Sequence, residues 1–157
     1  MLDDVVGLAR DADGFVHEGA LITPESNLRH RREEAPPEGV VSKIFRLHRR
    51  KVFNEFIRSA PLLALLREMF DGEVDCFLSQ FIFKNPGAWG QPWHQDAYYF
   101  PFDRAPQVGL WLAVTEAHLE NGCLHVLPGS HGEPIHEHVP DGRPGANFGY
   151  VEIVDHD

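Results

Sequence analysis

Apolar and polar side chains alternate with a period of two along several short stretches of this chain, a pattern typical of half-buried strands. The clearest stretch is Val40 to His48, where Val41, Lys43 and Phe45 fall on one face. Further strands are predicted at residues 74–84, around His94, at 107–116, at 122–127 and at 150–154. Asn121-Gly122 predicts the turn of a hairpin between two of them.

Between the first two predicted strands, apolar residues recur at helical spacing. Residues 52–60 and 61–70 each predict a helix with one apolar side, and Asp71-Gly72 ends the second. Residues 1–39 are polar and predict a lead-in with a short helix and a solvated loop. Helices followed by many short strands favour the α+β class, with one domain over residues 1–157 and a jelly roll formed by residues 40–157.

Composition narrows the function classes. The chain has 157 residues, 43% of them hydrophobic, which is enough for one domain with its own core. Its formal net charge of -10 argues against nucleic-acid binding, and the longest apolar run is strand-sized, which argues against a membrane protein. Two cysteines make no disulfide framework, and the N-terminus lacks a signal-peptide pattern, so we expect a cytoplasmic protein.

The tripeptide His94-Gln95-Asp96 carries the chemistry. On a strand, His94 and Asp96 would share one face with Cα atoms about 6.6 Å apart, so an imidazole and a carboxylate could bind one metal ion. One further His would complete the 2-His-1-carboxylate ligand set of non-heme Fe(II) oxygenases. An isolated His-x-Asp tripeptide is weak evidence, so its surroundings decide the interpretation.

The surroundings of the tripeptide follow a recognisable pattern. From Trp93 to His131 the chain reads WHQDAYYFPFDRAPQVGLWLAVTEAHLENGCLHVLPGSH, and VVSKIF and FIFKNPG precede it at Val40 and Phe81. These motifs closely resemble the phytanoyl-CoA dioxygenase family. The resemblance implies a double-stranded β-helix (a cupin-like jelly roll) with flanking N-terminal helices. It also implies Fe(II), 2-oxoglutarate and O2 as cofactors for the hydroxylation of an aliphatic C–H bond in a small-molecule or acyl substrate.

The resemblance also suggests roles for single residues. Lys43 would contact the 2-oxoglutarate carboxylate, Gln80 and Trp111 would line the cosubstrate site, and Gln95 would approach it through its backbone. We expect Lys43, Gln80, His94, Asp96 and Trp111 to converge on one cavity. Each cosubstrate residue also has a plainer interpretation: a Lys that reaches water from a sheet edge, a hydrogen-bonded core Gln and a packed core Trp.

The remaining histidines give no third metal ligand. His125 is a strand residue in this interpretation, His131 belongs to the PGSH turn, and His136 and His138 lie in a loop rich in Pro and Gly. His156 falls where the family has a loop.

The family's distal His, and the Arg that pairs with 2-oxoglutarate, are absent from this sequence, which predicts a domain that is incomplete at its C-terminus. The alternative is a non-catalytic jelly-roll module that binds a metal or ligand through His94 and Asp96, and through His136 and His138.

Overall fold

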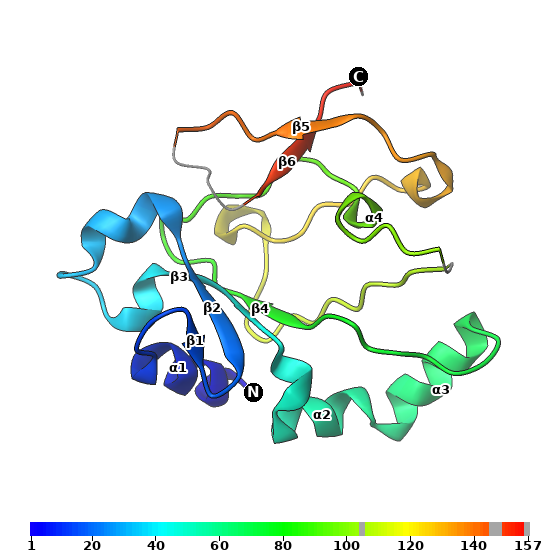
Figure 1. Ribbon diagram of the computed structural model, residues 1–157, viewed down its shortest axis with the longest axis horizontal. Helices are drawn as coiled ribbons and strands as arrows, with labels where there is room; N and C mark the ends of the chain where they lie inside the picture. Colours follow the sequence, from blue (N-terminus) through cyan, green and yellow to red (C-terminus); the bar gives the residue numbers. More distant parts are fainter. Residues whose placement is uncertain (104–105, 145–148, 156–157) are drawn as a thin grey trace. The chain divides into compact units, whose positions relative to one another are not determined.

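The computed structural model of the chain describes residues 1–103, 106–144 and 149–155. These residues form two compact units, Met1–Ala88 and Trp89–Asp157, and each is considered by itself. The first unit carries most of the regular structure, whereas the second is built largely from irregular segments (Figure 1). Among the described residues, no helix is long and apolar enough to cross a membrane.

The first unit is organised around a four-stranded antiparallel sheet in the order β1-β2-β3-β4. Its strands are β1 (Val16–His17), β2 (Ala20–Pro24), β3 (Val41–Phe45) and β4 (Gln80–Ile82). The prediction of a strand at 40–48 is confirmed by β3. The strand predicted over 74–84 is shorter than expected, because only its last part pairs with β3.

Two strands lie inside the stretch predicted as a lead-in. Glu18 and Gly19 connect β1 to β2 with φ angles of 45° and 78°, and His17 pairs with Ala20 across them. A two-residue turn with both φ angles positive matches the twist of a hairpin, and glycine adopts such a φ at little cost. The short helix expected in this lead-in is confirmed at Leu2–Asp11, and residues 29–34 are exposed. The two strands were not expected, because Glu-Gly is a weaker hairpin signal than Asn-Gly.

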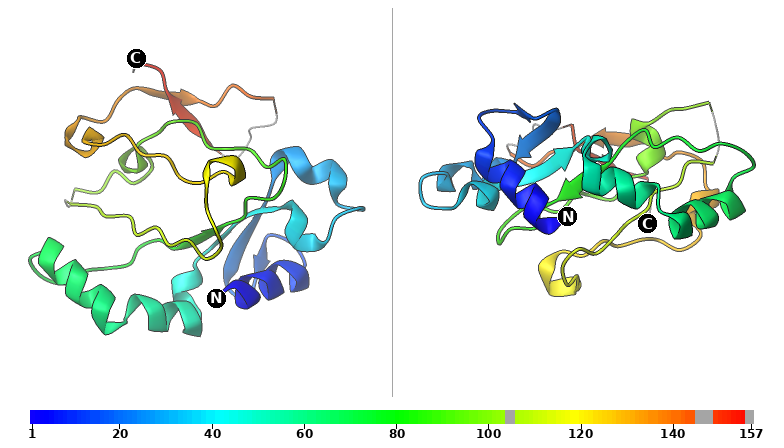
Figure 2. Two further views of the ribbon diagram at one scale, coloured as in Figure 1. Left: turned by 180° about the vertical axis from the view of Figure 1, so that it is seen from behind. Right: turned by 90° about the horizontal axis from the view of Figure 1, so that it is seen from below.

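The core of the first unit lies between α1 (Leu2–Asp11) and the sheet (Figures 1 and 2). The helix contributes Val5 and Leu8, and Ile22 and Ile44 from β2 and β3 belong to the same buried cluster. Ile44 is fully buried, at 0% exposure. The opposite face of β3 carries Lys43 and Phe45, because successive strand residues point to opposite faces.

Helical segments connect the strands of this unit. Between β2 and β3 lie the 3-10 turns η1 (Ser26–Arg31) and η2 (Pro37–Val40); η3 (Leu47–Arg49), α2 (Lys51–Ile57) and α3 (Ala60–Met69) follow β3. Both helices predicted at 52–70 are confirmed. The apolar side of α3 is not buried as expected: Leu65 and Met69 are each 48% exposed.

The described residues of the second unit form one small sheet and three short helical turns. The sheet pairs β5 (His138–Pro140) with β6 (Val151–Ile153), which confirms the strand predicted at 150–154. The turns are α4 (Asp96–Tyr99), η4 (Leu119–Asn121) and η5 (Ser130–Gly132).

The strands predicted at 107–116 and 122–127 do not form. Asn121 ends a 3-10 turn instead: its Oδ1 accepts the His118 N–H at 2.8 Å, and its Nδ2 donates to the Glu116 carbonyl at 2.9 Å. Leu110 and Val126 are 54% and 73% exposed, so this stretch lacks the burial that stabilises a pleated strand.

The described residues thus combine helices with antiparallel sheets, as the α+β prediction states. They contain no closed barrel.

Candidate metal centre

His94 and Asp96 face one another in the second unit. His94 Nε2 lies 3.4 Å from Asp96 Oδ1, and the two side chains are 21% and 78% exposed. The predicted strand around His94, which would have placed both side chains on one face, does not form. Gln95 is extended, with φ -108° and ψ 126°, and Asp96 begins the single turn of α4. This change from extended to helical backbone brings the carboxylate alongside the imidazole.

The orientation of the His94 ring is fixed by a second hydrogen bond. Its Nδ1 lies 2.8 Å from the carbonyl oxygen of Pro92, which can only accept, so Nδ1 carries the proton of this bond. Nε2 is then the nitrogen that faces Asp96. Metal-binding histidines usually donate their other ring N–H to such a partner, and this partner sets the tautomer. The pair therefore fits two of the three protein ligands of a nitrogen–oxygen metal site.

Tyr99, the last residue of α4, borders His94. The two rings lie edge to face with centroids 5.7 Å apart, and the Tyr99 hydroxyl accepts the Val151 N–H at 3.0 Å. Burial raises the pKa of Tyr99, so this hydroxyl stays neutral at physiological pH. The hydroxyl connects α4 to β6.

Gln95 points its side chain toward residues 134–136. Its Nε2 donates to the Pro134 carbonyl at 3.0 Å, and its Oε1 accepts the His136 N–H at 2.7 Å. The contact of its backbone with 2-oxoglutarate stays a prediction.

Lys43 and Gln80, the residues expected to meet 2-oxoglutarate from the first unit, share one face of its sheet. Lys43 pairs with Ile82 and Phe45 pairs with Gln80, and paired residues of antiparallel strands point to the same side. Lys43 is only 8% exposed, whereas Gln80 is exposed. Their roles stay predictions, as does the convergence of the five side chains on one cavity.

Trp111 is placed differently from expectation. It lies in the irregular stretch before η4 and is 52% exposed, so the strand face it was expected to share with Gly109 and Ala113 does not form. Its contact with the cosubstrate stays a prediction.

No third ligand joins the pair within residues 1–103, 106–144 and 149–155, because no group of three His, Cys, Asp or Glu side chains there could hold a metal. His125 and His131 are exposed. His136 lies between Glu133, 2.8 Å from Nε2, and Asp155, 3.3 Å from Nδ1; the Glu133 bond is the main reason that the pKa of His136 is raised. His156 falls outside the described residues.

His138, which the sequence analysis considered only as half of a second binding pair with His136, contacts the tripeptide. Its Nε2 accepts the backbone N–H of Gln95 at 3.1 Å, and its ring stacks on Tyr98 at 4.3 Å. The only available signal was the His136-Glu137-His138 pattern, which suggested a second metal pair instead of a support for the first.

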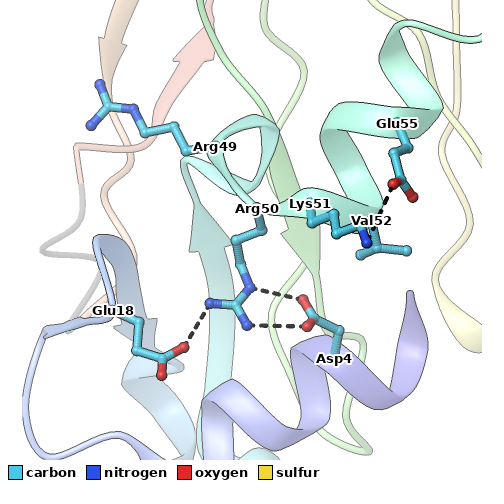
Figure 3. Close-up of a pocket in the computed structure, with 7 residues that line it drawn as sticks. All are labelled: Asp4, Glu18, Arg49, Arg50, Lys51, Val52 and Glu55. Carbon is cyan, nitrogen blue, oxygen red and sulfur yellow. Dashed lines mark hydrogen bonds and ion pairs between the residues drawn. The ribbon is translucent and has the colours of Figure 1, made fainter.

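A pocket of about 570 Å³ lies elsewhere, in the first unit (Figure 3). Arg50 lies at its centre and donates to Asp4 Oδ2 at 2.9 Å, to Asp4 Oδ1 at 3.1 Å and to Glu18 Oε2 at 2.8 Å. Besides Val52, the lining consists of three acidic and three basic residues, so its charges balance: Asp4, Glu18, Glu55, Arg49, Arg50 and Lys51. These ion pairs join α1, the β1–β2 turn and the start of α2.

Comparisons with known proteins place the chain in a class. A family model described as Phytanoyl-CoA dioxygenase (PhyH) matches residues 10–152. The chain belongs to this family, and the resemblance seen in the motifs is confirmed. The description of this family names dioxygenase activity.

Individual relatives of the chain also carry the name of this family. The "Phytanoyl-CoA dioxygenase domain-containing protein 1" of Mus musculus is 37% identical over 124 residues, which cover 72% of this chain and 42% of the relative. "Phytanoyl-CoA dioxygenase, peroxisomal" of Bos taurus is 33% identical over 134 residues, which cover 80% of this chain and 39% of the relative. The chain thus spans about two fifths of the length of these relatives. No solved structure gives a significant match.

Proposed function

We propose that the chain carries part of the centre of an Fe(II)- and 2-oxoglutarate-dependent dioxygenase, with His94 and Asp96 as two of the three metal ligands. The observation that carries the proposal is the 3.4 Å approach of His94 Nε2 to Asp96 Oδ1, with Nδ1 held by the Pro92 carbonyl. An imidazole and a carboxylate are the ligand types of non-heme iron oxygenases.

The bound metal, with 2-oxoglutarate and O2, would supply the oxidising power to hydroxylate an aliphatic C–H bond, with succinate and CO2 as co-products. The residues of the protein would bind the metal and orient 2-oxoglutarate. His94 contributes a neutral nitrogen, and Asp96 contributes a negative charge that offsets the charge of the cation. Lys43 is proposed for the carboxylate of 2-oxoglutarate because its ammonium group is the complement of that charge. Gln80, Gln95 and Trp111 are proposed around the cosubstrate.

We infer a double-stranded β-helix for the whole family domain, and a small-molecule or acyl substrate for its reaction. The α+β content of this chain agrees with the inferred fold. The family membership supports both inferences.

The third metal ligand and the Arg partner of 2-oxoglutarate are not among the residues that we assign. Two protein ligands hold a metal more weakly than three, and loss of one ligand or its support commonly lowers affinity about 10-fold or more. The 157-residue chain is therefore expected to bind Fe(II) weakly and to turn over 2-oxoglutarate slowly.

The test measures Fe(II) binding under anaerobic conditions and, separately, succinate release with Fe(II), ascorbate and O2. His94→Ala and Asp96→Asn should each abolish both signals. His125→Ala, which removes an exposed His from the same unit, is the matched control and should bind and react like the unaltered chain. Binding that is identical in the unaltered chain and in His94→Ala would refute the metal assignment.

The non-catalytic module is not favoured, because the matching family and relatives are named as dioxygenases. The two histidines suggested as the second metal pair of this module also have other hydrogen-bond partners. His136 bonds to Glu133, and His138 accepts the Gln95 N–H. Metal binding that depends on His94, without any succinate from 2-oxoglutarate, is the result that would revive it.

A further inference from the structure

Two hydrogen bonds join the backbone on either side of His94 to the small sheet of the second unit, one from a backbone N–H of β6 and one to a side chain of β5. Ile153 of β6 donates its N–H to the Trp93 carbonyl at 2.9 Å, one residue before His94. Gln95 donates its N–H to the Nε2 of His138, the first residue of β5, at 3.1 Å. The sheet therefore forms hydrogen bonds with the residues immediately before and after His94.

The His138 ring is itself fixed in the state that this bond requires. Its Nδ1 lies 2.8 Å from the backbone carbonyl oxygen of His136, which can only accept a hydrogen bond, so Nδ1 carries the proton. Nε2 therefore presents a lone pair to the Gln95 N–H. The ring also stacks on Tyr98, with centroids 4.3 Å apart and planes 21° from parallel. Tyr98 belongs to α4, the turn that begins with Asp96. One imidazole thus contacts the backbone between the two ligands and the helical turn that carries the second.

The Gln95 side chain completes this arrangement. Its bonds to the Pro134 carbonyl and the His136 N–H connect it to the segment that precedes His138. Three hydrogen bonds therefore join Gln95 to residues 134–138. A displacement of this segment would change the backbone angles at Gln95, and with them the distance between His94 Nε2 and Asp96 Oδ1.

We propose that His138 is a positioning residue for the metal centre: by accepting the Gln95 N–H and stacking on Tyr98, it holds His94 and Asp96 at the separation that a single cation requires. This role rests on the proposed function, since it presupposes that the pair binds a metal. His138 does not enter the ligand set, because its Nε2 is engaged by Gln95. Such supporting groups typically contribute 10-fold or more to metal affinity.

The experiment titrates the 157-residue chain with Mn(II), a stand-in for Fe(II), and follows binding by the relaxation of water protons, which reports weak as well as tight sites. His138→Phe keeps a ring against Tyr98 but removes the acceptor, and should raise the dissociation constant about 10-fold. His138→Gln places an amide oxygen near the position of Nε2 and should restore binding to within about 3-fold. His125→Phe, the same substitution at an exposed site of the same unit, should leave binding unchanged.

The outcomes separate this inference from the proposed function. If His94→Ala abolishes Mn(II) binding while His138→Phe binds like the unaltered chain, the positioning role is wrong and the metal assignment stands. If His94→Ala binds like the unaltered chain, both are wrong. A His138→Gln variant as weak as His138→Phe would also overturn the role, because it would show that the acceptor is not what matters.

A measurement on the unaltered chain covers the case in which His138→Phe does not fold. Long-range proton–nitrogen NMR spectra distinguish the two tautomers of a histidine. The structure requires His138 to carry its proton on Nδ1, and the Gln95 amide to be protected from hydrogen exchange relative to exposed amides. A proton on Nε2, or an unprotected Gln95 amide, would overturn the inference.

Discussion

The sheet of the first unit and the stretch from 106 to 127 have similar patterns of apolar residues but different environments. Ile44 of β3 is 0% exposed, and Leu47, in η3 directly after that strand, is 1% exposed; both belong to a buried cluster that includes residues of α1 and β2. Leu110 and Val126 are 54% and 73% exposed in segments without regular structure. This difference shows that the alternation of apolar and polar residues determines which face of a strand would be apolar. Whether the strand forms depends on burial of that face against another element.

The largest effect is expected from Leu47→Ala. The substitution leaves a cavity in a closely packed cluster, so it should lower the free energy of unfolding by about 3 kcal/mol. Far-UV circular dichroism during urea unfolding follows α1, α2 and α3, which all belong to the first unit. A loss below about 1 kcal/mol would show that the core at Leu47 is less tightly packed than the structure indicates.

Arg50→Gln should have a smaller effect that depends on pH. Hydrogen bonds from Arg50 lower the pKa of both Asp4 and Glu18. Carboxyl groups with lowered folded-state pKa values stabilise the fold above their unfolded pKa values, and this contribution disappears as the pH falls through the folded ones. The variant should therefore be less stable than the unaltered chain at pH 7, by much less than Leu47→Ala because solvent screens these charges.

The measurement compares urea midpoints of Arg50→Gln and the unaltered chain between pH 7 and pH 3. The difference should shrink as the pH falls from about 5, because both carboxylates become protonated. Lys51→Gln is the control, since the Lys51–Glu55 pair is exposed and its atoms lie 3.9 Å apart. A difference that stayed constant with pH would show that Arg50 acts through packing instead of charge.

The smallest effect is expected from Leu110→Ala, the same substitution as at Leu47 but at a half-exposed position. It should change stability by less than about 0.5 kcal/mol, as surface substitutions usually do. Tryptophan fluorescence follows the second unit, which contains all three tryptophans of the chain, Trp89, Trp93 and Trp111. A loss comparable to that of Leu47→Ala would show that residues 106–127 are buried in solution.

Local patterns predicted the elements whose apolar periodicity is clear or whose end signals are strong. The helices at 51–57 and 60–69 and the strand at 41–45 follow directly from apolar periodicity. The β1–β2 hairpin was missed because its two-residue turn lacks Asn or Asp. The Asn121-Gly122 hairpin was predicted but does not form, since the Asn121 side chain caps a 3-10 turn.

The sequence predicted the pair of candidate ligands but not its geometry. The assignment of His94 and Asp96 as metal ligands stays a prediction; the structure shows that the two side chains approach one another through a helical turn, not through a strand. The role proposed for His138 could not be read from the sequence. It depends on a bond to Gln95, 43 residues away, and on the pairing of β5 with β6.

The lengths of the strands in the first sheet have a consequence for solubility. The inner strands β2 and β3 have five residues each, whereas the outer strands β1 and β4 have two and three. Unpaired backbone groups on an outer strand can recruit another chain, and very short outer strands offer few such groups. This sheet is therefore a poor template for edge-to-edge aggregation. Exposed apolar side chains, which are most numerous at residues 108–127, offer another surface for self-association.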